Sequence, residues 1–187
     1  MSGRFRLAET SVPGLRVIER VRIEDRRGYL QRLFCADELG DAGWTGPIAQ
    51  VNHTCTRAAG TVRGMHYQHP PHADAKLVLC LRGAVFDVAV DLRAGSATRF
   101  RWHAETLTPE NGRAILIPKG FAHGFQALVP DVELLYLHSA PHVAAAEDGI
   151  HPADPALEIR WPLPVVGLSE RDRNHPPLTA EFPGIFA

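Results

Sequence analysis

The chain has 187 residues, long enough for one sizeable core, and we expect a single domain over residues 1–187. Its 20 Lys and Arg residues nearly balance its 21 Asp and Glu residues, which leaves a formal net charge of −1. Without a basic block, the sequence argues against nucleic acid or an anionic membrane as the main partner, although a few local arginines can still bind a phosphate.

Cysteine content and the length of apolar runs indicate the cellular compartment. The three cysteines show no C-x-x-C spacing, which argues against a disulfide scaffold or a structural zinc site and fits a reducing compartment. Residues 1–14 lack the apolar segment of a signal peptide. No apolar run approaches the roughly 18 residues that span a bilayer. We therefore expect a cytoplasmic protein with no membrane association.

Short β-type runs dominate the chain. In chain order they occupy residues 15–23, 28–34, 76–83, 84–93, 99–107, 113–118, 124–129 and 132–139. Helical patterns are confined to residues 36–43 and 168–173, and the Pro-rich part from about Pro152 looks like an irregular wrap. Many short strands between turn residues indicate an all-β sandwich or barrel with short peripheral helices.

The run at residues 84–93 shows the clearest alternation with period two. Asp87 and Asp91 share one face of the expected strand, and four apolar residues share the other. With the preceding run, it predicts a β-hairpin that turns at Arg82-Gly83.

The segment GRAILIPKGFAHGF, residues 112–125, carries the most specific local pattern. Its residues Gly112, Pro118, Gly120 and His123 fit G-x5-P-x-G-x2-H. This pattern resembles the second conserved motif of the cupin superfamily, whose fold is a small antiparallel jelly-roll barrel. In that motif the glycines and the proline shape a hairpin that brings the histidine to the barrel mouth.

The first cupin motif, G-x5-H-x-H-x3-4-E-x6-G, fits only in part. Gly60 and His66 fit its start, but Gln68 stands where the second histidine belongs and Lys76 replaces the acidic ligand. A lysine ammonium cannot coordinate a divalent ion at neutral pH and would repel it, so we expect no metal here. A neutral histidine beside a lysine instead suits proton abstraction next to a ketone, because the lysine can stabilise the enolate oxygen.

Much of the chain resembles the dTDP-4-dehydrorhamnose 3,5-epimerase family, which are nucleotide-sugar epimerases on a cupin jelly roll. The matching stretches are DRRGY (25–29), QVNHT (50–54), GTVRGMHYQ (60–68), AKLVLCLRGAVFDVAVDLRAGS (75–96), IPKGFAHGF (117–125), ELLYL (133–137) and LSERDRNHPPL (168–178). The resemblance implies inversion of C3 and C5 of a nucleoside-diphosphate 4-keto-6-deoxyhexose, with no metal or redox cofactor. It also implies a nucleotide-sugar partner and a homodimer that exchanges its N-terminal strands.

The resemblance assigns four catalytic roles. His66 takes the proton, and Asp172 pairs with it and holds its ring, as in other base–orienter dyads. Lys76 stabilises the C4 enolate. Tyr136 returns a proton from the opposite face, which a phenol of pKa about 10 can do, and a nearby lysine would favour its phenolate form.

The resemblance also assigns substrate contacts. Arg27 and Arg63 match positions that bind the diphosphate and nucleotide side, where an arginine fork suits phosphate oxygens. Further substrate contacts fall on Gln50, Asn52, His123, Glu147 and Arg171. The other histidines are expected to be surface or structural residues: His53, His69, His72, His103, His138, His142, His151 and His175.

Two stretches depart from the family pattern. Leu30 stands at the second aromatic position after DRRG, and Arg32 stands at an acidic position that touches the partner's nucleotide base. Since a guanidinium donates hydrogen bonds where a carboxylate accepts them, this change raises the hypothesis of a nucleotide other than dTDP, or of a loosely held base. After Tyr136 the chain reads LHSAPH (137–142), where the family commonly has an aromatic pair, so inversion of C3 alone is an alternative.

Two other functions compete with this reading. A metal-dependent cupin enzyme would need bound iron, zinc or manganese. A non-catalytic cupin that binds sugar nucleotides would have no need of a paired base and acid. Taken singly, His66 and Tyr136 could be core residues, Lys76 a solvated strand residue and Asp172 a surface residue.

Overall fold

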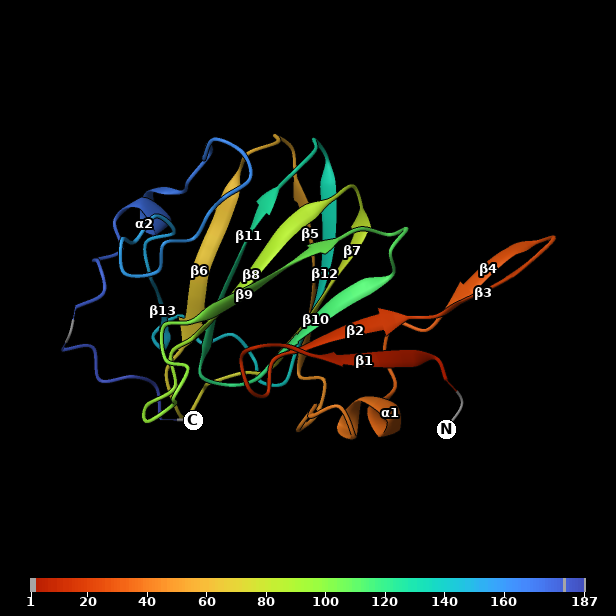
Figure 1. Cartoon of the computed structure of the whole chain (residues 1–187), viewed down its shortest axis with the longest axis horizontal. Helices are drawn as coiled ribbons and strands as arrows, with labels where there is room; N and C mark the ends of the chain where they lie inside the picture. The colour runs from red at the N-terminus through yellow and green to blue at the C-terminus, as the bar shows by residue number, and fades with distance from the viewer. Residues whose placement is uncertain (1–2, 180, 187) are drawn as a thin grey trace.

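The computed structural model describes residues 3–179 and 181–186, and this part of the chain forms thirteen β-strands and two short helices. The pairings between these strands are antiparallel. Two sheets face each other, and a separate hairpin extends away from them (Figure 1). The expected all-β antiparallel fold with short peripheral helices is confirmed.

The first sheet has six strands in the order β1-β2-β10-β7-β12-β5, and the second has five in the order β13-β6-β11-β8-β9. The first sheet comprises β1 (Phe5–Glu9), β2 (Arg16–Arg20), β5 (Gln50–Thr56), β7 (Lys76–Arg82), β10 (Arg113–Ile117) and β12 (Val132–His138). The second comprises β6 (Val62–Gln68), β8 (Val85–Asp91), β9 (Trp102–Leu107), β11 (Phe121–Ala127) and β13 (Glu147–Gly149). The projecting hairpin is β3 (Arg22–Asp25) with β4 (Gly28–Gln31).

Two expected hairpins are wrong. The turn at Arg82-Gly83 connects β7 to β8, but β7 belongs to the first sheet and β8 to the second. The segment with Pro118 and Gly120 likewise links β10 in one sheet to β11 in the other. Gly83 has a φ of +81°, which suits the sharp change of direction. Local turn residues predict the turn, whereas the jelly-roll topology decides which strands pair across it.

Alternation along the strands divides buried side chains among three clusters. On β7, Val78 and Cys80 point between the sheets, while Leu77 and Leu79 pack outward beside helix α1 (Ala36–Gly40). The core between the sheets also contains side chains from β8, β9, β10, β11 and β12, so it ties the two layers together. Apolar burial of this kind is the main stabilising contribution to such a sandwich.

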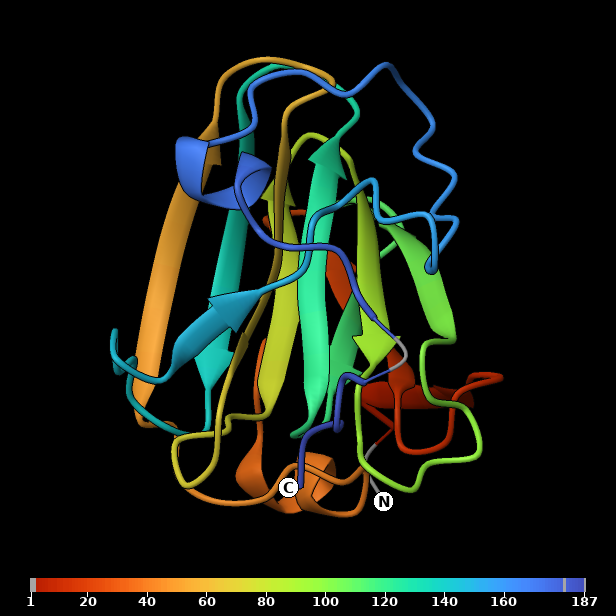
Figure 2. The same ribbon diagram turned by 90° about the vertical axis from the view of Figure 1, so that its left-hand side faces the viewer.

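The C-terminal segment covers the outer face of the second sheet. Val88 and Val90 of β8 pack there against Ile150, Leu157 and Ile185, and the chain can be followed across this face in Figure 2. The wrap expected after Pro152 is confirmed: apart from isolated bridges, its only regular element among the described residues is helix α2 (Glu170–Arg173).

Strand β8 is buried on both faces. Asp87 and Asp91 lie on the same face, as the alternation predicts, and both are fully buried between the sheets. Asp91 accepts hydrogen bonds from the side chains of Arg93, Ser96 and Thr98. Burial alone would raise the pKa of Asp91, but these donors lower it to about 2.

No helix within residues 3–179 and 181–186 is long and apolar enough to cross a membrane.

Candidate active site

A cavity of about 250 Å³ opens between the two sheets. Its walls are formed by β5, β6, β11 and β12 and by the first residue of β7. Most of the side chains that these strands turn toward the cavity are polar. Nine of the expected site residues line it: Gln50, Asn52, Arg63, His66, Lys76, His123, Tyr136, Glu147 and Arg171. The polar part of the interior therefore gathers residues that lie far apart in the sequence.

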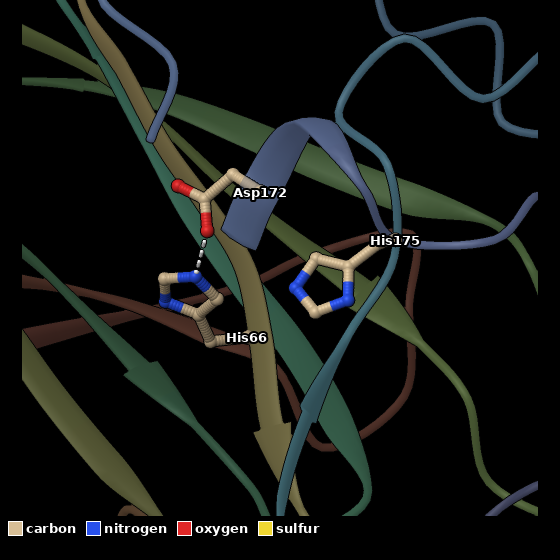
Figure 3. Close-up of side chains that lie close together, drawn as sticks. All are labelled: His66, Asp172 and His175. Carbon is tan, nitrogen blue, oxygen red and sulfur yellow. Dashed lines mark hydrogen bonds and ion pairs between the residues drawn. The ribbon is translucent and has the colours of Figure 1, made fainter. Parts of the chain in front are cut away.

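His66 and Asp172 form a hydrogen-bonded pair at this cavity. The His66 Nε2 atom lies 2.6 Å from Asp172 Oδ1, and the Asp172 side chain is only 4% exposed (Figure 3). Helix α2 begins just before Asp172, and the Asp172 N–H donates to the Ser169 hydroxyl, which fixes the carboxylate beside β6. Burial would raise the pKa of Asp172, but the interaction with His66 lowers it, so Asp172 is an anion at neutral pH.

This pairing assigns the ring nitrogens of His66. Since an ionised carboxylate only accepts, His66 Nε2–H donates to Asp172 and the Nδ1 atom is left unprotonated in the neutral ring. Figure 3 shows Nδ1 turned away from both Asp172 and His175. The pair therefore has the arrangement of a general base and the group that orients it.

His175 is a neighbour of this pair that the sequence did not reveal. Its ring lies 6.3 Å from the His66 ring, centroid to centroid, and its side chain is 10% exposed. The ring fits only because residue 149 is glycine, since a Cβ there would lie 2.3 Å from His175 Nε2. Burial lowers the pKa of His175, and the charge that His66 carries once protonated lowers it further, which favours a neutral His175 ring beside the dyad.

His66, Asp172 and His175 also raise the question of a metal, because their ligand atoms lie within 4.8 Å of one another. The surroundings do not suit a divalent ion. An Arg171 guanidinium nitrogen lies 3.1 Å from His66 Nε2, the same nitrogen that would have to bind the ion. Its positive charge would oppose a second cation at that point.

Tyr136 lies on β12, in the sheet that faces His66. Its ring packs edge-on against the His123 ring, with the two ring centroids 5.8 Å apart, and its side chain is almost fully buried. Burial raises the pKa of Tyr136 and the Asp87 charge raises it further, while Arg63 lowers it in part. The expectation that Lys76 favours a phenolate is therefore wrong. Tyr136 is held as a protonated phenol, the form that a proton donor needs.

His123 belongs to a second, more deeply buried pair. It lies opposite His66 in the register of β6 and β11, and its Nε2 atom lies 2.9 Å from Asp87 Oδ2. The exposed fractions of the two side chains are 7% and 0%. The hydrogen bond from His123 offsets the free-energy cost of burying the Asp87 carboxylate, which would be large without a partner.

Lys76 and His138 share one carboxylate, Asp74. Lys76 Nζ lies 3.6 Å from Asp74 Oδ1, and His138 Nδ1 lies 2.8 Å from Asp74 Oδ2. Asp74 and His138 both line the cavity and were not expected there. Period-two alternation offered a signal for His138, which lies two positions after Tyr136 on β12, but not for Asp74, which precedes the first residue of β7.

Further contacts tie the rim of the cavity together. Glu147 Oε2 lies 2.9 Å from His142 Nε2 and accepts from Arg171 Nη1 at 2.6 Å. Burial would raise the pKa of Glu147, but its bonds to His142 and Arg171 lower it. Gln50 accepts from the His142 N–H and donates to Asn52. His142, expected to be a surface or structural residue, thus belongs to the site.

A second cavity of about 530 Å³ lies beside the first and shares Arg63, His66 and Arg171 with it. Arg57 and several hydroxyl groups add to its walls. Guanidinium and hydroxyl donors of this kind suit phosphate oxygens.

Two expected substrate contacts lie outside both cavities. Arg27 is on the turn of the β3–β4 hairpin, exposed and bonded to Asp25 at 2.6 Å. Arg32 follows β4 and pairs with Glu38 of α1. Neither lines a cavity of its own chain. The expected contact of Arg27 with the diphosphate and nucleotide side and that of Arg32 with a partner's nucleotide base stay predictions.

Comparison with known proteins gives a consistent result. The family model described as dTDP-4-dehydrorhamnose 3,5-epimerase matches residues 9–180. A dTDP-4-dehydrorhamnose 3,5-epimerase of Sinorhizobium fredii is 39% identical over 181 residues, which cover 94% of this chain and 90% of the relative.

Solved structures agree in fold. The crystal structure of a dTDP-6-deoxy-D-glucose-3,5-epimerase from Legionella pneumophila, in complex with dTDP-4-keto-L-rhamnose, has a TM-score of 0.91 and 36% identity, with coverage of 98% of this chain and 99% of that chain. A 3'-monoepimerase from Streptomyces bikiniensis in complex with dTDP-quinovose has a TM-score of 0.84 and 36% identity, with coverage of 90% and 85%.

Proposed function

The chain belongs to the dTDP-4-dehydrorhamnose 3,5-epimerase family and is an isomerase, and from this premise we propose that it inverts C3 and C5 of a dTDP-4-keto-6-deoxyhexose. The observation that carries the proposal is the position of two groups across one cavity. His66, paired with Asp172 of helix α2, lies on the second sheet, and the protonated Tyr136 lies on the facing sheet. Inversion of a carbon requires a base and an acid on opposite faces.

Each inversion follows the same steps at a carbon next to the C4 ketone. His66 removes the proton, and the electron pair of the broken C–H bond passes to the C4 oxygen as an enolate. Lys76 stabilises that oxygen with its ammonium charge. This stabilisation is strongest in a site that excludes water. Tyr136 then donates its proton to the same carbon from the other face. Proton removal at C3 and C5 is possible because both carbons flank the ketone.

The two cavities divide the substrate between them in this proposal. The sugar occupies the first cavity, among His66, Lys76 and Tyr136. The diphosphate lies where the cavities meet, because Arg63 and Arg171 line both. Guanidinium groups at that position supply charge-assisted hydrogen bonds to the phosphates.

We also propose that the active form is a homodimer. The β3–β4 hairpin projects away from the rest of the chain and exposes Ile23, Tyr29 and Leu30, each at 45% or more (Figure 1). Apolar side chains on a projecting strand pair are typical of an element that a partner covers. In a dimer, this hairpin would bring Arg27 and Arg32 to the nucleotide of the partner chain.

Proton NMR of dTDP-4-keto-6-deoxyglucose with the protein in D₂O tests the proposed function. Deuterium at both C3 and C5 with formation of the inverted sugar is the expected result. Deuterium at C3 alone would identify a C3 epimerase, and no exchange would support a binding protein without turnover. Titration with dTDP, UDP, CDP and GDP tests the nucleotide, with clear preference for dTDP expected.

A further inference from the structure

We propose that His138 is a positioning residue for this reaction: it orients the Asp74 carboxylate, which in turn holds the Lys76 ammonium in place. The inference rests on the proposed function, because it concerns how the enolate-stabilising group is aimed. It begins from a line of contacts along one wall of the cavity, formed by adjacent residues of β7 and β12.

Lys76 and His138 are Cα partners in the pairing of β7 with β12, so their side chains leave the sheet side by side. Asp74 uses a different oxygen for each of them: Oδ1 lies 3.6 Å from Lys76 Nζ, and Oδ2 lies 2.8 Å from His138 Nδ1. All three side chains are at least 85% buried. A buried carboxylate between two donors is held in one orientation by both.

The protonation states follow from the partners. Burial would raise the pKa of Asp74, but the Lys76 charge and the bond to His138 lower it, so Asp74 is ionised at neutral pH. As an acceptor, it takes the Nδ1–H of His138. Asn52 Nδ2 lies 3.4 Å from His138 Nε2 and can donate to it. The Nδ1 side of the His138 ring therefore serves Asp74, and the Nε2 side faces the Asn52 amide.

The need for such a group lies in the flexibility of lysine. Its ammonium sits at the end of a four-carbon stem and makes point-like contacts with no fixed direction. If His138 did not hold Oδ2, the carboxylate could turn both oxygens toward Lys76 and draw the ammonium away from the ketone oxygen. Preorganised charge matters most in the transition state, so the loss should lower kcat more than it changes KM.

Two variants of similar shape separate this role from packing. In His138→Asn, the amide nitrogen occupies nearly the position of Nδ1 and keeps the donor to Asp74. In His138→Gln, the amide extends toward the position of Nε2 and keeps the contact with Asn52 instead. We expect His138→Gln to lower kcat about tenfold, as for a lost charge-assisted hydrogen bond, with KM changed less than about twofold. We expect His138→Asn to keep a kcat close to that of the wild type, because it keeps the donor to Asp74.

A double-mutant cycle with Asp74→Asn tests whether His138 acts through Asp74. Once the carboxylate is gone, His138→Gln should cost less than about twofold in kcat, because interacting residues are not additive. His53→Ala serves as a control, since His53 is on β5 but its exposed side chain pairs with Glu133 and lies outside both cavities.

The outcomes separate this inference from the proposed function. Equal losses in His138→Asn and His138→Gln, or additive losses in the cycle, would overturn the positioning role while wild-type turnover stands. Absence of wild-type turnover would instead contradict the proposed function, and this role with it. Thermal unfolding of each variant shows whether a loss reflects the fold.

Discussion

Two of the histidine–aspartate pairs in the site, His66–Asp172 and His123–Asp87, have surroundings that differ sharply. His66 and His123 are opposite each other on β6 and β11. The His66 ring is 27% exposed and adjoins both cavities, whereas the His123 ring is 7% exposed. Asp172 belongs to a helix of the C-terminal wrap, and Asp87 belongs to a strand of the barrel.

This difference separates a reactive pair from a supporting one. The first leaves a ring nitrogen free to take a proton, with Asp172 to stabilise the cation that forms. The second keeps a negative charge near Tyr136, and that charge helps hold the phenol in its protonated form. One kind of residue pair thus serves the base on one sheet and the acid on the other.

The largest effect is expected from His66→Ala, which removes the base itself. General bases contribute about 10²- to 10⁴-fold to rate, so kcat should fall by at least about 10²-fold while the thermal midpoint changes little. His69→Ala is the matched control, because His69 follows β6 but is exposed and lies outside both cavities. A rate near that of the wild type in His66→Ala would refute the assigned base.

A smaller effect is expected from Asp87→Asn, which acts on the acid. Burial and the Asp87 charge both raise the pKa of Tyr136, so removing the charge lowers that pKa. Because the donor must be protonated, the alkaline limb of the pH profile should lie at a lower pH in the variant than in the wild type. A pH profile of kcat measures this. An alkaline limb that does not move would show that Asp87 has no influence on the acid.

Asp91→Asn tests a carboxylate on the same face of β8 that takes no part in the reaction. Its pKa of about 2 lies below the ordinary value of 3.8, so its ionised form stabilises the fold above about pH 4, and this contribution is lost as pH falls toward 2. The variant should lose about 2 kcal/mol of unfolding free energy at pH 7 and less at pH 3, with kcat unchanged. Urea unfolding at the two pH values provides the measurement. An equal loss at both would contradict the assigned ionisation.

The strands and the faces of their side chains could be predicted because period-two alternation is local. The alternation in residues 84–93 placed Asp87 and Asp91 together, although it did not show that this face would be the interior. Strand pairing across Gly83 could not be predicted, since a turn residue fixes a change of direction and not a partner.

Tyr136 and Asp172 could be assigned catalytic roles only through the family resemblance. His66 and Asp172 are 106 positions apart, and nothing in the ERDR segment alone distinguishes Asp172 from a surface carboxylate. His138 could have been found from its spacing to Tyr136 on one strand face. His175 could not, because its position depends on the absence of a side chain at Gly149, in a distant strand.

Tyr136→Phe in D₂O tests the central claim most directly, because the base and the acid are held to be separate groups on facing sheets. Without the phenol, His66 can still remove a proton and return a deuteron to the same face. The account predicts that deuterium enters C3 while formation of the inverted sugar falls by at least about 10²-fold. Inversion at the wild-type rate, or loss of exchange together with inversion in a folded variant, would contradict it.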